Sequence, residues 1–264
     1  MMTEIIGYLL ATLIGISLGI IGAGGSILTV PILVYIMKLD AVTATGYSLF
    51  VVGASSLSGA IESYIKKQVD LKTAFLFGLP SIFSALVVRK WLLPMIPDTL
   101  FASGAFSFTK HIFILVVFAL VMIAASVSMI RPQKNPAINS KEDQLPAIIL
   151  SGVAVGILTG LVGAGGGFLI IPALVLLLHL PIKKAIGTSL LIITMNTLGS
   201  FAGAATIMDI HWSFLLLFTG FAIGGMLLGI ILRTKISGEK LKPAFGWFVL
   251  VMGIYIIIKE LFFA

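Results

Sequence analysis

A glycine-rich break inside an apolar run, present twice, restricts the fold of this chain more than any other feature. The stretch "GIIGAGGSILTVPIL" (19–33) returns as "GLVGAGGGFLIIPAL" (160–174). Glycine lowers helix stability by roughly 1 kcal/mol relative to alanine, so the shared Gly-Ala-Gly-Gly cluster interrupts a helix in each copy. Two such interruptions at an offset of 141 positions (Gly22 to Gly163) indicate a duplicated unit that is broken at the same place in both copies.

The composition is that of an integral membrane protein. Of 264 residues, 59% are hydrophobic and only 10% are charged, with a mean hydropathy of +1.18. Soluble proteins carry about 25% charged residues, so this chain has too few charges to solvate a surface. The net charge of +7 then indicates cationic cytoplasmic loops rather than a nucleic-acid partner. The chain has no cysteine, which excludes disulfides and thiolate sites.

Ten apolar segments follow one another along the chain, and each is expected to be helical because backbone amides in hydrocarbon must be paired. Eight are long enough to span a bilayer, which needs about 20 residues, and the short ones each follow a glycine break. The opening "MMTEIIGYLL" is predicted to be the first span and not a removable signal peptide. The segments are 4–21, 26–37, 42–64, 73–93, 111–130, 145–162, 167–179, 185–208, 212–232 and 244–262.

The sequence predicts two halves of five segments each. A polar, proline-containing linker, 131–146, separates an N-terminal repeat, 1–130, from a C-terminal repeat, 147–264. The offset of 141 also pairs Pro31 with Pro172, Gly46 with Gly187 and Ser48 with Ser189. Because five is odd, the second copy is expected to insert upside down.

The basic residues support that orientation. With both termini outside, only Lys38, Arg89, Lys90, Lys110 and Lys259 of the 17 Lys and Arg lie outside, in agreement with the positive-inside rule. We therefore expect an all-α polytopic protein of the plasma (inner) membrane with two inverted-topology repeats of five helical segments. A homodimer is one assembly that the sequence allows.

The glycine breaks are candidate anion sites. A break followed by a short helix leaves free N–H groups and a positive dipole end, and glycine lets an oxyanion approach the backbone. Pro31 and Pro172 are predicted to be hinges within the short segments. The alternative is that these glycines only permit tight helix packing. The candidate residues are Gly22, Ala23, Gly24, Gly25 and Ser26 in one copy, and Gly163, Ala164, Gly165, Gly166 and Gly167 in the other.

Hydroxyl and amide side chains after each break form a second candidate surface. Ser48 and Ser55 are i, i+7 on one helical face, and Ser189 and Asn196 occupy the equivalent positions. Thr45 and Thr188 lie beside them. The simpler interpretation is that each hydroxyl bonds to its own helix backbone, although an unpaired buried amide at Asn196 would be costly.

The sequence predicts structural roles for other small or charged residues. The Gly152-Gly156-Gly160, Gly15/Gly19, Gly220/Gly224 and Gly225/Gly229 spacings predict helix packing faces. Glu62 could relay protons, but an ion pair with nearby Lys66 or Lys67 is the favoured interpretation. His111, His179 and His211 have no metal-ligand spacing, and we expect neither a metal nor a cofactor.

The two glycine-proline stretches, each followed by "ATGYSL" or "AIGTSL", resemble the TauE/SafE family of sulfite exporters across nearly the whole chain. The resemblance implies export of small sulfur-containing anions such as sulfite, sulfoacetate or related organosulfonates, with Gly22–Gly25, Pro31, Gly163–Gly167, Pro172 and the Ser48 and Ser189 regions at the site. The chain has no nucleotide-binding G-x-x-x-x-G-K-[ST] motif. The alternatives are an anion channel and an intramembrane serine hydrolase that uses Ser189 and His211.

Overall fold

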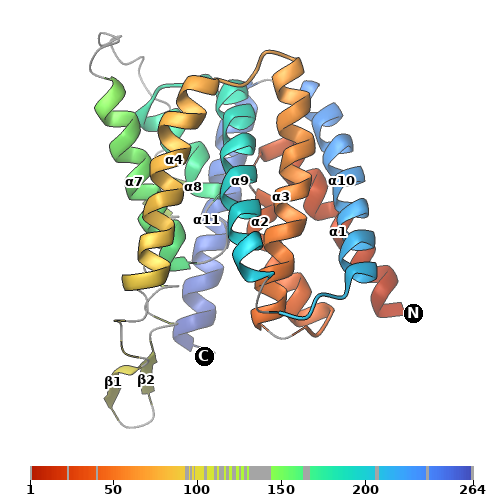
Figure 1. Ribbon diagram of the computed structural model, residues 1–264, viewed down its shortest axis with the longest axis vertical. Coiled ribbons are helices and arrows are strands. Elements are labelled where there is room, and N and C mark those ends of the chain that lie inside the picture. Colours follow the sequence, from red (N-terminus) through yellow and green to blue (C-terminus); the bar gives the residue numbers. More distant parts are fainter. Residues whose placement is uncertain are drawn as a thin grey trace.

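The chain forms a bundle of helices that run along one long axis (Figure 1). The computed structural model describes residues 2–22, 24–39, 41–92, 95, 97, 99–103, 106–109, 112, 116, 119–120, 123–124, 126–127, 130, 144–162, 167–205, 208–235 and 238–262. Helical segments at the first four predicted positions are α1 (Met2–Ile21), α2 (Gly24–Pro31) continued by the π-turn η1 (Ile32–Ile36), α3 (Ala41–Ile65), and α4 (Leu71–Val87) continued by the π-turn η2 (Val88–Leu92).

The elements of the second half follow in a similar order. Its elements are α7 (Gln144–Val162), α8 (Gly167–Pro172) continued by the π-turn η3 (Ala173–Leu177), α9 (Ile182–Ala204), α10 (Trp212–Thr234) and α11 (Gly238–Phe262). The described residues of the predicted segment 111–130 are helical. Helix α7 begins at Gln144, within the last residues of the predicted linker, and positions 131–143 of that linker lie outside the described residues.

The sequence did not predict the antiparallel hairpin of β1 (Thr99–Ser103) and β2 (Phe106–Thr109). It projects from one end of the bundle (Figure 1) and is an exception to the predicted all-α fold. Its "TLFAS" and "FSFT" stretches are short and rich in aromatic and β-branched residues, which favour strands. The body of the protein is nevertheless helical.

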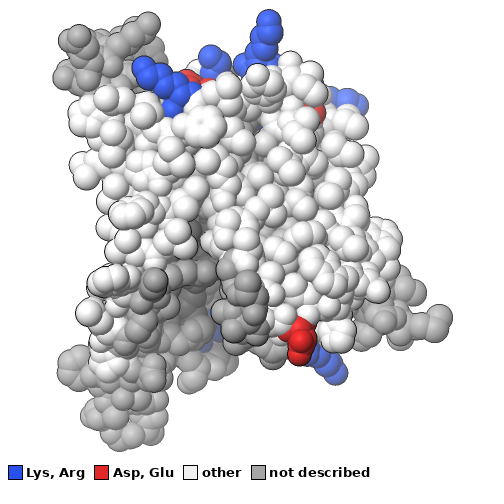
Figure 2. All heavy atoms as spheres, viewed as in Figure 1, with Lys and Arg blue, Asp and Glu red and all other residues white. Residues whose placement is uncertain are grey.

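The outer surface of the bundle is apolar. Leu79, Phe83 and Leu150 are more than half exposed, and the face in Figure 2 has an uncharged middle with its charges at the two ends. A contiguous apolar surface of this size is not stable in water. Among the described residues α3, α9 and α10 are long and apolar enough to cross a membrane, and α1, α4, α7 and α11 contain shorter apolar helices of 10–17 residues. The protein is therefore membrane-embedded.

The helices of the bundle pack in pairs. Helix α1 packs along α10, α4 along α7, and α3 along α9. Gly15 touches the backbone of Ala222 on α10, and its counterpart at the offset of 141, Gly156, touches the backbone of Ser81 on α4. A Cβ atom at either glycine would overlap a carbonyl oxygen. These glycines are packing positions, as the sequence predicted.

The prediction for Gly220 and Gly224 is wrong. Among the described residues, a Cβ on either glycine would meet no atom within 4 Å, because both glycines lie on an exposed face of α10. They line an open apolar groove of about 490 Å³ with Leu217 and Leu228. The close contact of α10 with α1 uses the neighbouring pair instead, Gly225 and Gly229.

Basic residues gather at one end of the bundle, at the top of Figure 2. We call this the basic end. It consists of the α3–α4 loop, the start of α9 and the end of α10, which are joined by hydrogen bonds from Asp70 N–H to Thr188 Oγ1 (3.0 Å) and from Arg233 Nη2 to Ser63 Oγ (3.3 Å). The basic residues there are Lys66, Lys67, Lys72, Lys183, Lys184, Arg233 and Lys235. Both termini lie at the opposite end, which we call the terminal end (Figure 1).

Candidate functional site

The first glycine break requires glycine at one position. Gly22 has φ of +86°, in the left-handed region, and its N–H donates to the carbonyl of Leu18 at 2.6 Å. A Cβ there would lie 2.6 Å from Ile186 Cγ2 and 3.2 Å from Ile171 Cδ1. The break is therefore pressed against α8 and α9 of the second half. Gly24 and Gly25 open α2, Ala23 lies outside the described residues, and the side chain of Ser26 is not described.

The second break is described only at its end. Gly163, Ala164, Gly165 and Gly166 lie outside the described residues, and Gly167 begins α8 as a buried residue. The short helices α2 and α8 contact each other. The two half-helices that follow the breaks thus meet inside the bundle, as the anion-site hypothesis requires.

Both proline positions mark a change of helix type. Pro31 ends α2 before η1, and Pro172 ends α8 before η3. Proline lacks an N–H and cannot continue the α-helical ladder, so the turn that follows widens. Each short segment then ends in a left-handed residue, Lys38 (φ 58°) or His179 (φ 53°), which are equivalent at the offset of 141.

Several predicted site hydroxyls bond to their own helices. Ser48 Oγ donates to Thr45 O at 2.7 Å, and Ser189 Oγ donates to Ile186 O at 2.8 Å. The same holds for Thr194, a buried hydroxyl on the same helix as Ser189, whose Oγ1 donates to Leu190 O at 2.8 Å. For these side chains the simpler interpretation holds, because a backbone carbonyl of the same helix already accepts the hydrogen bond of the hydroxyl.

Ser55 and Asn196 differ from them. Both are buried and equivalent at the offset of 141, and Ser55 Oγ and Asn196 Oδ1 have no hydrogen-bond partner among the described residues. Asn196 Nδ2 lies 3.4 Å from Ser81 Oγ, a long contact. A buried polar atom without a partner costs roughly 1–3 kcal/mol, so such atoms are expected to have a ligand.

Ser55 and Asn196 form a polar cluster with two further serines, Ser56 and Ser81, which the spacing of the sequence does not single out. Ser56 Oγ is buried and has no hydrogen-bond partner in the described part of the chain, and Ser81 on α4 is fully buried beside Asn196. Ser56 lies next to Ser55 in the sequence, but Ser81 has no counterpart of similar polarity in the other half, where Ala222 occupies its position. Only the packing of α4 against α9 places Ser81 here.

The polar cluster lies where α3 and α9 pack along each other in opposite directions (Figure 1). A Cβ at Gly53 on α3 would lie 2.8 Å from Thr197 Oγ1. A Cβ at Gly59, almost two turns further along α3, would lie 3.1 Å from Leu190 Cδ1. Ser55 and Ser56 lie between these two points. They are therefore level with Thr194 and Asn196, far from both ends of either helix.

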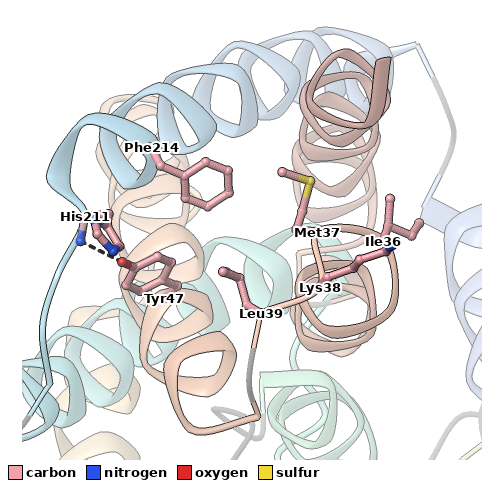
Figure 3. A pocket seen from close by; sticks show the side chains of 7 residues that line it. All are labelled: Ile36, Met37, Lys38, Leu39, Tyr47, His211 and Phe214. Atoms are coloured by element: carbon pink, nitrogen blue, oxygen red, sulfur yellow. Dashed lines mark hydrogen bonds between the residues drawn. The ribbon is translucent and has the colours of Figure 1, made fainter. Parts of the chain in front are cut away.

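A pocket of about 380 Å³ opens at the terminal end (Figure 3). Phe214, Leu39 and Tyr47 surround it, and Lys38 and His211 add polar groups. The N–H of His211 donates to the Tyr47 hydroxyl at 2.7 Å. This bond is the counterpart of the one from Asp70 N–H to Thr188 Oγ1 at the basic end, since both residues match at the offset of 141.

The hydroxyls of Tyr47 and Thr188 can be tested by the same measurement of stability. Tyr47→Phe and Thr188→Val each leave one loop N–H without its partner, and we expect each to lower the free energy of unfolding by about 1–3 kcal/mol. Thermal unfolding of the purified protein tests this. Tyr64→Phe, at a side chain that is 58% exposed, is the control. Unfolding temperatures equal to that of Tyr64→Phe would show that the loops do not depend on these bonds.

The hydrolase hypothesis fails on geometry. Ser189 follows Thr188, which is bonded to the α3–α4 loop at the basic end, whereas His211 is bonded to Tyr47 near the start of α3. Nucleophile and base therefore lie at opposite ends of α3, and a base must lie within hydrogen-bond reach of its nucleophile.

Glu62 takes part in ion pairs, as the sequence predicted. It pairs with Lys66 one turn later and lies 3.7 Å from Arg233 Nη2. No cluster of three or more His, Cys, Asp or Glu that could hold a metal occurs in the described part of the chain.

Comparison with known proteins identifies the family. The profile of the sulfite exporter TauE/SafE family matches residues 8–256. The chain belongs to the TauE/SafE family. It is therefore a membrane transporter and not an enzyme.

Several TauE/SafE relatives match this chain over most of their length. A probable membrane transporter protein of Xylella fastidiosa (strain 9a5c) is 29% identical over 252 residues, which cover 93% of this chain and 91% of the relative. MJ0441 of Methanocaldococcus jannaschii is 27% identical, with 96% and 94% covered, and YunE of Bacillus subtilis is 27% identical, with 99% and 100% covered. Both are also named probable membrane transporter proteins.

Proposed function

We propose that this TauE/SafE protein exports small sulfur-containing anions, such as sulfite, sulfoacetate or related organosulfonates, through a site in the middle of the membrane. The family's description supports the anion class. The observation that carries the site is a pair of buried atoms on residues at equivalent positions, Ser55 Oγ and Asn196 Oδ1, neither of which has a hydrogen-bond partner among the described residues. The amides at the starts of α2 and α8 would complete it, because free N–H groups and hydroxyls bind an oxyanion without a fixed counter-charge.

Asn196 can serve this site in either orientation of its amide. In the structure Oδ1 has no hydrogen-bond partner among the described residues. An exchange of the amide O and N would let the oxygen accept from Ser81 and turn the NH₂ towards a ligand. An anion needs donors, so this second orientation is the one we propose for the loaded state.

The two halves are proposed to be inverted repeats. The bounds of η1 and η3 differ by the offset of 141, and the bond from Leu39 N–H to Leu33 O (3.1 Å) has its counterpart from Leu180 N–H to Leu174 O (3.0 Å). The pair α1–α10 corresponds to α7–α4, and α3 pairs with its own counterpart α9. Such exchange of partners is expected for a pseudo-two-fold axis in the membrane plane.

The basic end is proposed to face the cytoplasm, with both termini outside. This orientation follows the positive-inside rule and puts the pocket of Tyr47 and His211 on the exit side. With the cytoplasm negative, each negative charge that moves outward gains about 2.3 kcal/mol per 100 mV. Export of a sulfite-like anion could then proceed without a nucleotide.

Flux in proteoliposomes tests the site. We expect Asn196→Leu to lower the rate of sulfite and sulfoacetate efflux about tenfold or more, because it removes a donor inside the membrane, and Ser55→Ala to lower it less. Thr219→Val is the matched control, since Thr219 is also buried but donates to Leu215 O in its own helix. Wild-type flux in both site variants would reject the midplane site, and unitary currents in place of saturable flux would indicate a channel.

A further inference from the structure

Arg233 is buried at the basic end, unlike the lysines around it. It lies in the last turn of α10, and its side chain is 3% exposed. Lys67, Lys72 and Lys235 at the same end are exposed, and the Lys66 side chain is 42% exposed. A guanidinium is costly to remove from water unless its donors are paired, so the burial of Arg233 needs an explanation.

The partners of Arg233 are incomplete. Its Nη2 lies 3.3 Å from Ser63 Oγ and 3.5 Å from Gln68 Oε1, and its Nη1 is buried without a hydrogen-bond partner among the described residues. Glu62 Oε2 is 3.7 Å from Nη2, beyond hydrogen-bond distance, and also lacks a hydrogen-bond partner there. The fork of an arginine matches two oxygens of an oxyanion, but its acidic neighbour does not take that position.

The duplication does not explain this arrangement. At the offset of 141, Arg233 corresponds to Leu92 and Glu62 to Gly203. The terminal end therefore has no equivalent ion pair at these positions. The Arg233–Glu62 contact joins α10 of the second half to α3 of the first, where a change in one side chain can affect how the halves meet.

We infer that Arg233 is an entry site for small oxyanions at the basic end and that Glu62 competes with them for it. This inference rests on the proposed function and extends it to a second binding position. An arriving sulfite or sulfonate takes the Nη1 and Nη2 donors together, and Glu62 keeps only its pair with Lys66. The anion leaves for the midplane when Glu62 returns.

Anion-dependent thermal stabilisation of the purified protein tests this inference, with sulfite and inorganic phosphate as the probes. A ligand that binds the native state raises the unfolding temperature, which yields an apparent Kd. We expect Arg233→Gln to weaken the apparent Kd for sulfite about tenfold or more, and Glu62→Gln to tighten it severalfold by removal of the competitor. Lys72→Gln, which removes an exposed charge at the same end, should change it less than about twofold.

The opposite signs separate this role from a structural one. A merely structural ion pair would make Arg233→Gln and Glu62→Gln shift the apparent Kd in the same direction or leave it unchanged. Either result overturns the inference, as does a wild-type protein that neither anion stabilises. If the wild type carries no sulfur anion but either probe still stabilises it in an Arg233-dependent way, the inference stands and the proposed substrate falls.

Discussion

Gly22→Ala is expected to abolish anion flux while the protein still inserts into the membrane. An alanine at φ +86° is strained by roughly 1–2 kcal/mol, and its Cβ would lie 2.6 Å from Ile186 Cγ2. Relief requires a shift of the break away from α9, which moves the amides at the start of α2. Because a binding site must keep its geometry to within a fraction of an ångström, such a shift is enough to lose the anion.

Efflux of sulfite from proteoliposomes measures this effect, with the amount of reconstituted protein as the reference. Gly199→Ala is the matched control, because Gly199 lies on α9 and a Cβ there meets no atom of the described residues within 4 Å. It should transport at the wild-type rate. Full flux in Gly22→Ala would show that the first break is not part of the site.

Gly15→Ala and Gly156→Ala should have the largest effects on stability. At both positions a Cβ would overlap a backbone carbonyl oxygen, of Ala222 for Gly15 and of Ser81 for Gly156. Backbone cannot move aside as a flexible side chain can, so the helices must separate, at a cost of about 3 kcal/mol or more. We expect both variants to unfold at markedly lower temperature than the wild type, and to a similar extent.

The fraction of monodisperse protein in detergent and its unfolding temperature measure this effect. Gly224→Ala is the control, since its Cβ would meet no atom within 4 Å in the part of the chain that the structure describes. Alanine also favours a helix by about 1 kcal/mol over glycine. It should be at least as stable as the wild type. A strong effect at only one of Gly15 and Gly156 would contradict the equivalent roles assigned to the two halves.

Much of the fold could be predicted from the sequence because the membrane restricts the backbone to few structures. The apolar segments predicted helices, and those described follow the predictions to within a few residues at most ends. The repeated motif predicted equivalent elements, and η1 and η3 have equivalent bounds. The hairpin of β1 and β2 was missed, because it lies in a loop for which hydropathy carries no signal.

The candidate site was predicted only in outline. The face with Ser48 and Ser55 was identified from its spacing. Spacing cannot distinguish a hydroxyl that bonds to its own helix, as Ser48 does, from one like Ser55, which has no hydrogen-bond partner among the residues that the structure describes. Spacing also could not show which glycine pair of α10 packs against α1, because it is the same in Gly220/Gly224 and Gly225/Gly229.

Membrane insertion, helix positions and family are properties of the order of residues along the chain, since hydropathy, glycine spacing and motif identity can all be read without knowledge of the packing. The assembly of the polar cluster is different. Ser81 meets Asn196 across 115 positions, and Arg233 meets Ser63 across 170. Such contacts depend on which helices pack together and how each is rotated, and local sequence does not encode either.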